Sequence, residues 1–169
     1  MHDLPSIMNE ILHGYALPMT GSHGVIHWAR VMENGMRLAK ETDADQEVVM
    51  LFALFHDCRR INEFHDDDHG LRGGEFARSL RGSLVHLDDK RFELLFEACR
   101  LHTDGHTEGD PTILTCWDAD RLDLGRVGIK PRPDLLCTEA ARELLWWAHE
   151  RAVTDHRPTD TLAAWRVEV

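Results

Sequence analysis

The stretch LFALFHDCRR at residues 51–60 decides the fold, because its unbroken apolar run ends in a histidine and a carboxylate. A run that is apolar on every side is typical of a central helix that other helices enclose. An ionised carboxylate buried there without a partner would cost several kcal/mol. Asp57 must therefore reach water or meet a cation, and the rest of the chain decides between these alternatives.

The composition indicates a single globular domain over residues 1–169. With 43% hydrophobic residues, the chain can bury one ordinary core. The net charge of −11 and the scattered positions of its 19 Lys and Arg argue against a general nucleic-acid partner. No apolar run has the length of a membrane span, and the N-terminus lacks the parts of a signal peptide. We therefore expect no membrane partner and a cytoplasmic location, while a homodimer stays open.

Helical periodicity runs through nearly the whole chain. It predicts helices over residues 3–12, from an N-cap at Ser22 to about 38, and over 45–60, 75–80, 88–102, 111–124 and about 138–153. The polar, glycine-bearing segment 61–74 and the tail 154–169 are predicted to be mostly irregular. No alternating strand pattern of any length is present in the sequence. The fold class that follows is all-α, a compact multi-helix bundle.

Potential metal ligands fall on the apolar faces of four predicted helices. These ligands are His27, the pair His56-Asp57, His102 and Asp120. Facing helices of a bundle can build a metal site in the core, and imidazole with carboxylate suits a divalent transition ion. Adjacent helical residues diverge by about 100°, so His56 and Asp57 can approach one metal from two sides, or Asp57 can bridge two. A cation would explain the burial of Asp57.

Three ordered motifs carry a family resemblance. They are HWARV at residues 27–31, LFALFHDCRR at 51–60 and DADRLDLGR at 118–126. Together they span a motif-bearing core of about residues 22–130, and their order resembles the HD-domain superfamily of metal-dependent phosphohydrolases. The resemblance implies an HD-type helical bundle with metal ligands at His27, His56, Asp57 and Asp120.

Two further histidines would complete a larger site. HGLRGG, from His69, is similar to the histidine-glycine step that follows the HD motif in many family members, and His102 matches a later family histidine. With both, the set resembles a dinuclear site bridged by Asp57. The resemblance implies one or two divalent ions, with nickel, cobalt, manganese, iron and magnesium all open. The GYP signature of cyclic-dinucleotide phosphodiesterases is absent from the sequence.

The family resemblance implies hydrolysis of a small phosphorylated substrate such as a nucleotide, by a phosphomonoesterase, nucleotidase or phosphodiesterase. His56 and Asp57 would then be catalytic, and Asp118 or His106 could act as general base, although Asp118 is more readily expected to support a ligand from behind or to be solvated. Candidate phosphate-binding cations lie near the presumed ligands: Arg59, Arg60, Arg72, Lys130 and Arg132.

Other interpretations stay open for the site and for single residues. A six-ligand set also permits a di-iron oxygenase, and a non-catalytic nucleotide or metabolite sensor would bind without turnover. His23 lies one turn before His27 and can face the same cavity, although a histidine at a helix start is usually exposed. The acidic run at 66–68 is expected to be solvated.

Overall fold

The computed structural model describes residues 2–169, which contain eight α-helices and no strand. The helices are α1 (Leu4–His13), α2 (Val25–Leu38), α3 (Gln46–Phe55), α4 (His69–Ser79), α5 (Asp89–Leu101), α6 (Pro111–Arg121), α7 (Glu139–Val153) and α8 (Thr159–Ala164). Two 3-10 turns lie at Leu124–Val127 and Pro133–Leu135. The predicted all-α fold class is confirmed.

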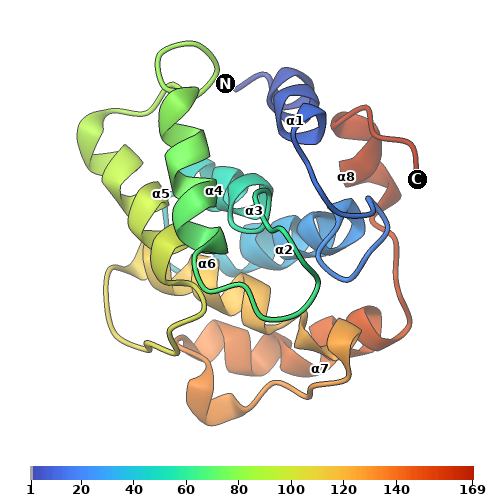
Figure 1. Cartoon of the computed structure of the whole chain (residues 1–169). Coiled ribbons are helices and arrows are strands. Elements are labelled where there is room, and N and C mark those ends of the chain that lie inside the picture. The colour runs from blue at the N-terminus through green and yellow to red at the C-terminus, as the bar shows by residue number, and fades with distance from the viewer. Residues whose placement is uncertain (1) are drawn as a thin grey trace.

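Helix α3 is the centre of the bundle (Figure 1), and α2, α4, α5 and α6 all contact it. Its side chains from Leu51 to Phe55 are fully buried, as the apolar run predicts. The helix ends at Phe55 rather than at residue 60, because the Cys58 N–H donates to the Phe55 carbonyl and tightens the chain into a turn. His56 and Asp57 therefore sit at the C-terminal end of α3, enclosed by its neighbours.

Side-chain caps fix the starts of most helices. α1, α3, α5, α6 and α7 begin after a residue whose side chain accepts a backbone N–H: Asp3, Asp45, Asp88, Asp110 and Thr138. The prediction of an N-cap at Ser22 is wrong, because α2 begins after Gly24, which offers no side-chain cap. The tail also differs from the prediction, since residues 159–164 form α8, which contacts α2.

Helix α4 begins at His69, six residues before the predicted start at residue 75. Its glycines lower the intrinsic helix propensity, but they also allow a very close approach to neighbouring helices. A Cβ at Gly73 would lie 2.1 Å from the Phe55 carbonyl oxygen, and one at Gly70 would lie 2.2 Å from the Cys99 carbonyl oxygen. Packing therefore overrides propensity here, and it places His69 on a helix rather than in a loop.

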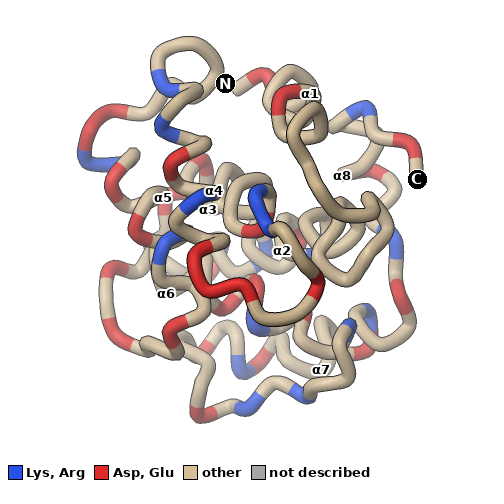
Figure 2. The backbone as a smooth tube through the Cα atoms, viewed as in Figure 1, with Lys and Arg blue, Asp and Glu red and all other residues tan. Residues whose placement is uncertain are grey.

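The described helices are too short or too polar to span a membrane, and charges of both signs are spread along the chain. Over residues 2–169, none of the helices combines the length and the apolar character that crossing a membrane requires. Figure 2 shows acidic and basic positions interspersed along the backbone, with the acidic run of residues 66–68 on the connection between α3 and α4.

The close contact at Gly73 predicts a large effect of a single methyl group. Gly73→Ala should lower the free energy of unfolding by about 2 kcal/mol, because overpacking against a backbone oxygen outweighs the gain in helix propensity. Chemical denaturation measures the change. Ser79→Ala, at an exposed position of the same helix, should stay within about 0.5 kcal/mol of the parent. Equal stability of both variants would contradict the packing argument.

Candidate metal centre

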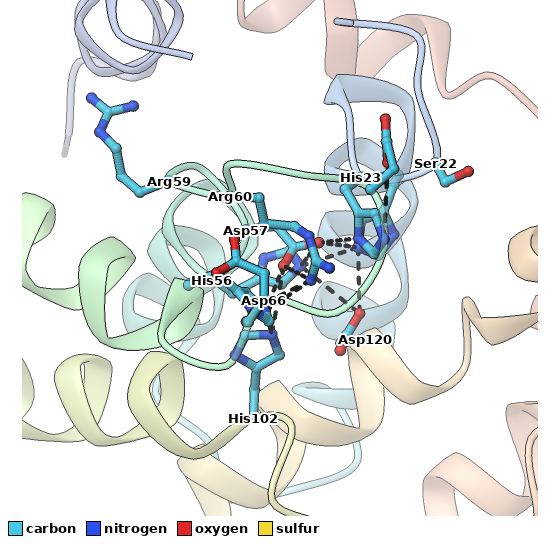
Figure 3. A network of polar contacts seen from close by, with 12 residues as sticks. Ser22, His23, His56, Asp57, Arg59, Arg60, Asp66, His102 and Asp120 are labelled. Carbon is cyan, nitrogen blue, oxygen red and sulfur yellow. Dashed lines mark hydrogen bonds and ion pairs between the residues drawn. The ribbon is translucent and has the colours of Figure 1, made fainter. Parts of the chain in front are cut away.

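The structure brings together all six side chains predicted as metal ligands. They come from five helices: His27 from α2, His56 and Asp57 from the end of α3, His69 from the start of α4, His102 just after α5, and Asp120 from α6. Figure 3 shows His56, Asp57, His102 and Asp120 pointing toward one another. The other two ligands face the same point, so the cluster has two halves that meet at Asp57.

The first half joins two imidazoles and two carboxylates. The Nε2 atoms of His27 and His56 are 3.1 Å apart. Asp57 Oδ2 lies 3.5 Å from the His27 nitrogen and 3.8 Å from the His56 nitrogen. Asp120 Oδ1 lies 3.4 Å from His27 Nε2 and 3.8 Å from His56 Nε2. Four donor atoms thus surround one small volume.

The second half repeats this arrangement around the other oxygen of Asp57. The Nε2 atoms of His69 and His102 are 3.0 Å apart. Asp57 Oδ1 lies 3.1 Å from the His69 nitrogen and 3.6 Å from the His102 nitrogen. Each oxygen of Asp57 therefore faces a different pair of histidines, which is the geometry expected of a shared ligand.

The outer nitrogen of every imidazole is already engaged. Each Nδ1 makes a hydrogen bond with an oxygen outside the cluster: Asp123 for His27, the Phe52 carbonyl for His56, the Asp66 carbonyl for His69 and the Cys99 carbonyl for His102. Because a carbonyl can only accept, Nδ1 carries the proton there, and the Nε2 lone pair points into the cluster. Such outer partners fix the tautomer of metal-binding histidines.

Two lone pairs about 3 Å apart repel each other unless a proton or a metal ion lies between them. Burial lowers the pKa of His56 to about 3, so its ring is neutral. Burial has the same effect on His27, but hydrogen bonds with neighbouring aspartates raise its pKa to about 9. Burial is likewise outweighed at His102, whose pKa is raised chiefly by Asp57. In both halves, the neighbouring carboxylates thus favour positive charge among the imidazoles.

The donor chemistry fits divalent metal binding. Asp57 Oδ1 is buried and has no hydrogen-bond partner among the described residues, as expected of a carboxylate oxygen that binds a metal ion. Burial alone would raise the pKa of Asp57 and Asp120, yet the surrounding imidazoles hold both below the usual range. Two ionised carboxylates with four imidazole nitrogens match the ligand preference of a divalent transition ion.

Two residues that sequence reasoning missed hold His27 in place. Asp123 Oδ2 lies 2.7 Å from His27 Nδ1, and Arg30 Nε donates to Asp123 Oδ1 over 2.7 Å. Arg30 in turn donates to the carbonyl of His156 beyond the end of α7. All three side chains of this chain, His27, Asp123 and Arg30, are buried. The one available signal was the spacing of Asp123, three residues after Asp120.

His23 also belongs to the cluster. Its Nδ1 lies 2.8 Å from Asp57 Oδ2, and only 12% of its side chain is exposed. Arg126 Nη2 lies 3.5 Å from the same nitrogen. Of the two alternatives for His23, the structure therefore supports the one in which it faces the same cavity as His27.

The predicted cations divide into one inside the cluster and four outside it. Arg60 Nη1 lies 3.6 Å from Asp57 Oδ1 and 3.1 Å from His69 Nε2, in a buried position. Arg59 extends away from the cluster (Figure 3). The four outer cations have other partners: Arg59 contacts the Ile11 carbonyl and the Phe76 ring, Arg72 the Asp66 carboxylate, Lys130 the Trp146 ring and Arg132 the Asp134 carboxylate.

The two candidate bases lie outside the cluster. Asp118 is buried, and its oxygens accept hydrogen bonds from the Cys137 N–H and from the N–H and hydroxyl of Thr138. Burial raises the pKa of Asp118, and its contacts anchor the start of α7. It is therefore not solvated, and its hydrogen-bond partners belong to the start of α7 rather than to the cluster. His106 is more than half exposed and contacts Asp104.

An all-helical bundle with a buried His-Asp pair at its centre defines the class of the protein. The HD domain family matches residues 24–148, so the chain belongs to this family. Among solved structures, it is similar to the crystal structure of a predicted HD superfamily hydrolase from an uncultured Thermotogales bacterium. The two share 28% sequence identity over 96% of this chain and 91% of that chain, with a TM-score of 0.67. No curated protein matches the chain.

The Asp123 contact generates a prediction for metal affinity. Asp123→Asn should weaken binding of Mn²⁺ by about 10- to 100-fold, because the charge that orients His27 is lost. Isothermal titration calorimetry measures the affinity. Asp118→Asn is the matched control, since it also neutralises a buried aspartate of this region but one that does not touch the cluster. It should reduce stability and leave Mn²⁺ affinity unchanged. An equal loss of affinity in both variants would show a general structural effect.

Proposed function

We propose that this protein is a metal-dependent phosphohydrolase that cleaves a phosphoester bond of a small substrate such as a nucleotide. The observation that carries the proposal is the convergence of four imidazoles and two carboxylates on one buried point, with Asp57 shared between the two halves. The family and the similar hydrolase structure support the same reaction class.

The cluster has an access route from one side. A cavity of about 290 Å³ is lined by His102 and Asp120. Asp120 is also more exposed than the other carboxylate, with 15% of its side chain accessible against 3% for Asp57. A substrate entering the cavity would therefore meet the cluster at Asp120 and His102, while Asp57 stays behind them.

The residues of the cluster have separate roles in the proposed reaction. A divalent metal held by them would lower the pKa of a bound water toward neutrality and polarise a phosphoryl oxygen. Arg60 provides a buried guanidinium whose Nη2 donates to the Phe64 carbonyl and whose Nη1 faces Asp57, so Nη1 is the donor that can bind a phosphate oxygen by a charge-assisted hydrogen bond. His23 donates to Asp57 and keeps that carboxylate oriented. Asp123 holds His27 in the tautomer that presents Nε2.

The complete six-ligand set is also the observation that favours a second candidate, a di-iron oxygenase. The two candidates differ in what the purified protein contains and consumes. Two irons per chain with oxygen uptake and no phosphate release would replace the phosphohydrolase. Ligand-dependent stabilisation without any turnover would instead support a sensor.

Removal of the shared carboxylate tests the proposed function. Asp57→Ala should lower phosphate release by at least ~100-fold, because even indirect partners of a metal ligand contribute 10- to 100-fold. The assay combines metal analysis of protein purified without chelator with a panel of phosphomonoesters, nucleotides and phosphodiesters. Asp68→Ala, an exposed acidic residue next to His69, should retain full activity. A parent protein without metal, or equal hydrolysis by Asp57→Ala, would overturn the proposal.

Adjacent arginines allow a matched test of substrate binding. Arg60→Gln should raise the KM about tenfold or more, because it removes a charged donor beside the cluster. Arg59→Gln should leave the KM and kcat unchanged, because this guanidinium contacts the Ile11 carbonyl and the Phe76 ring instead. Steady-state kinetics on the best substrate of the panel measures both variants. A raised KM in Arg59→Gln alone would contradict the assignment.

A further inference from the structure

The wall of the cavity beside the cluster is largely aliphatic. Behind His102 and Asp120, the cavity is lined by the end of α6, the 3-10 turn that begins at Leu124, the loop after α5 and the segment 131–136. The apolar lining residues are Leu124, Pro131, Leu135 and Leu136. Leu135 remains 43% exposed, so an apolar side chain is presented to whatever enters.

The charged residues of the wall are already engaged. Arg121 donates to the Leu135 carbonyl over 2.8 Å and to the His106 carbonyl over 2.6 Å, so it ties two segments of the wall together. Arg132 is paired with Asp134 at the exposed rim. Apart from Thr103, which also lines the cavity, hydroxyl groups of a ligand would therefore find few partners along this wall, and burying an unpaired hydroxyl is unfavourable.

We propose that this cavity binds a small, apolar leaving group, so that the substrate is the phosphate monoester of a compact aliphatic or aromatic alcohol. The inference rests on the proposed phosphohydrolase function and, among small phosphoesters, favours esters of apolar alcohols over nucleotides. In the reaction, the oxygen of water forms a bond to phosphorus and the bond from phosphorus to the ester oxygen breaks. That oxygen takes up a proton and leaves as the free alcohol, with inorganic phosphate as the second product.

The size of the cavity supports a compact ligand. Its volume of about 290 Å³ lies just below the range for small-molecule sites, roughly 300 to 1,000 Å³. One ring or one short branched chain fits this space when the phosphate lies against Asp120 and His102.

Two substrates of similar size separate apolar from polar leaving groups. Isopentyl phosphate and glycerol 3-phosphate are both esters of primary alcohols with the same number of non-hydrogen atoms, and they differ mainly in that the glycerol part carries two hydroxyl groups whereas the isopentyl chain is hydrocarbon throughout. We expect kcat/KM for isopentyl phosphate to be at least about tenfold higher, since small changes in an apolar pocket have effects of this size. A preference for glycerol 3-phosphate would overturn the inference.

A variant of the wall tests the same point independently. Leu135→Asn should reduce kcat/KM for isopentyl phosphate about fivefold or more and leave glycerol 3-phosphate hydrolysis nearly unchanged. Inhibition by inorganic phosphate should also be unchanged, because phosphate alone does not reach this wall. Leu71→Asn is the matched control, since Leu71 is 37% exposed and lies outside the cavity. It should leave kcat/KM for both substrates unchanged.

The outcomes distinguish the inference from the function on which it rests. Equal reduction of both substrates by Leu135→Asn would overturn the apolar site while phosphate release persists. Absence of phosphate release from every ester, with metal bound, would instead overturn the phosphohydrolase function, and the apolar-substrate proposal with it.

Discussion

The burial of one carboxylate, Asp57, is the constraint on which the rest of the structure depends. A carboxylate at the end of a helix that is apolar from Val48 to Phe55 is tolerated only because positively charged or hydrogen-bonding groups surround it. Four imidazoles converge on it from α2, α3, α4 and α5, and each is held from behind by an oxygen acceptor. The helices are therefore arranged around an electrostatic requirement as much as around an apolar core.

Much of the site could be predicted from the sequence, because polar residues on apolar helix faces are visible as exceptions to the pattern. His27, Asp57, His102 and Asp120 stood out in this way, and the order of the motifs joined them. The contact of Asp123 with His27 could not be predicted, since it links residues 96 positions apart. The sequence also could not predict that Arg60 faces the cluster while Arg59 extends away from it, because periodicity does not specify which partner a long side chain contacts.

In the fold, too, features set by the local sequence pattern could be predicted, whereas features set by packing between helices could not. The central helix followed from its apolar run, whereas the start of α4 at His69 did not, because three glycines in its first turns argue against a helix. The structure shows why glycine is needed there: a side chain at Gly73 would clash with the Phe55 carbonyl oxygen. This contact bears on the site as well as the fold, since it holds the start of α4, and with it His69, against the end of α3.

Because Asp57 presents one oxygen to each pair of histidines, the two halves of the cluster are thermodynamically linked. A cation that draws charge from one oxygen leaves less for the other, and two cations close together also repel each other. If both halves held a cation, occupancy of one would therefore lower the affinity of the other, and the effect would be reciprocal. Such a ligand set would offer a tighter and a weaker position, and its occupancy would depend on cation concentration in two steps.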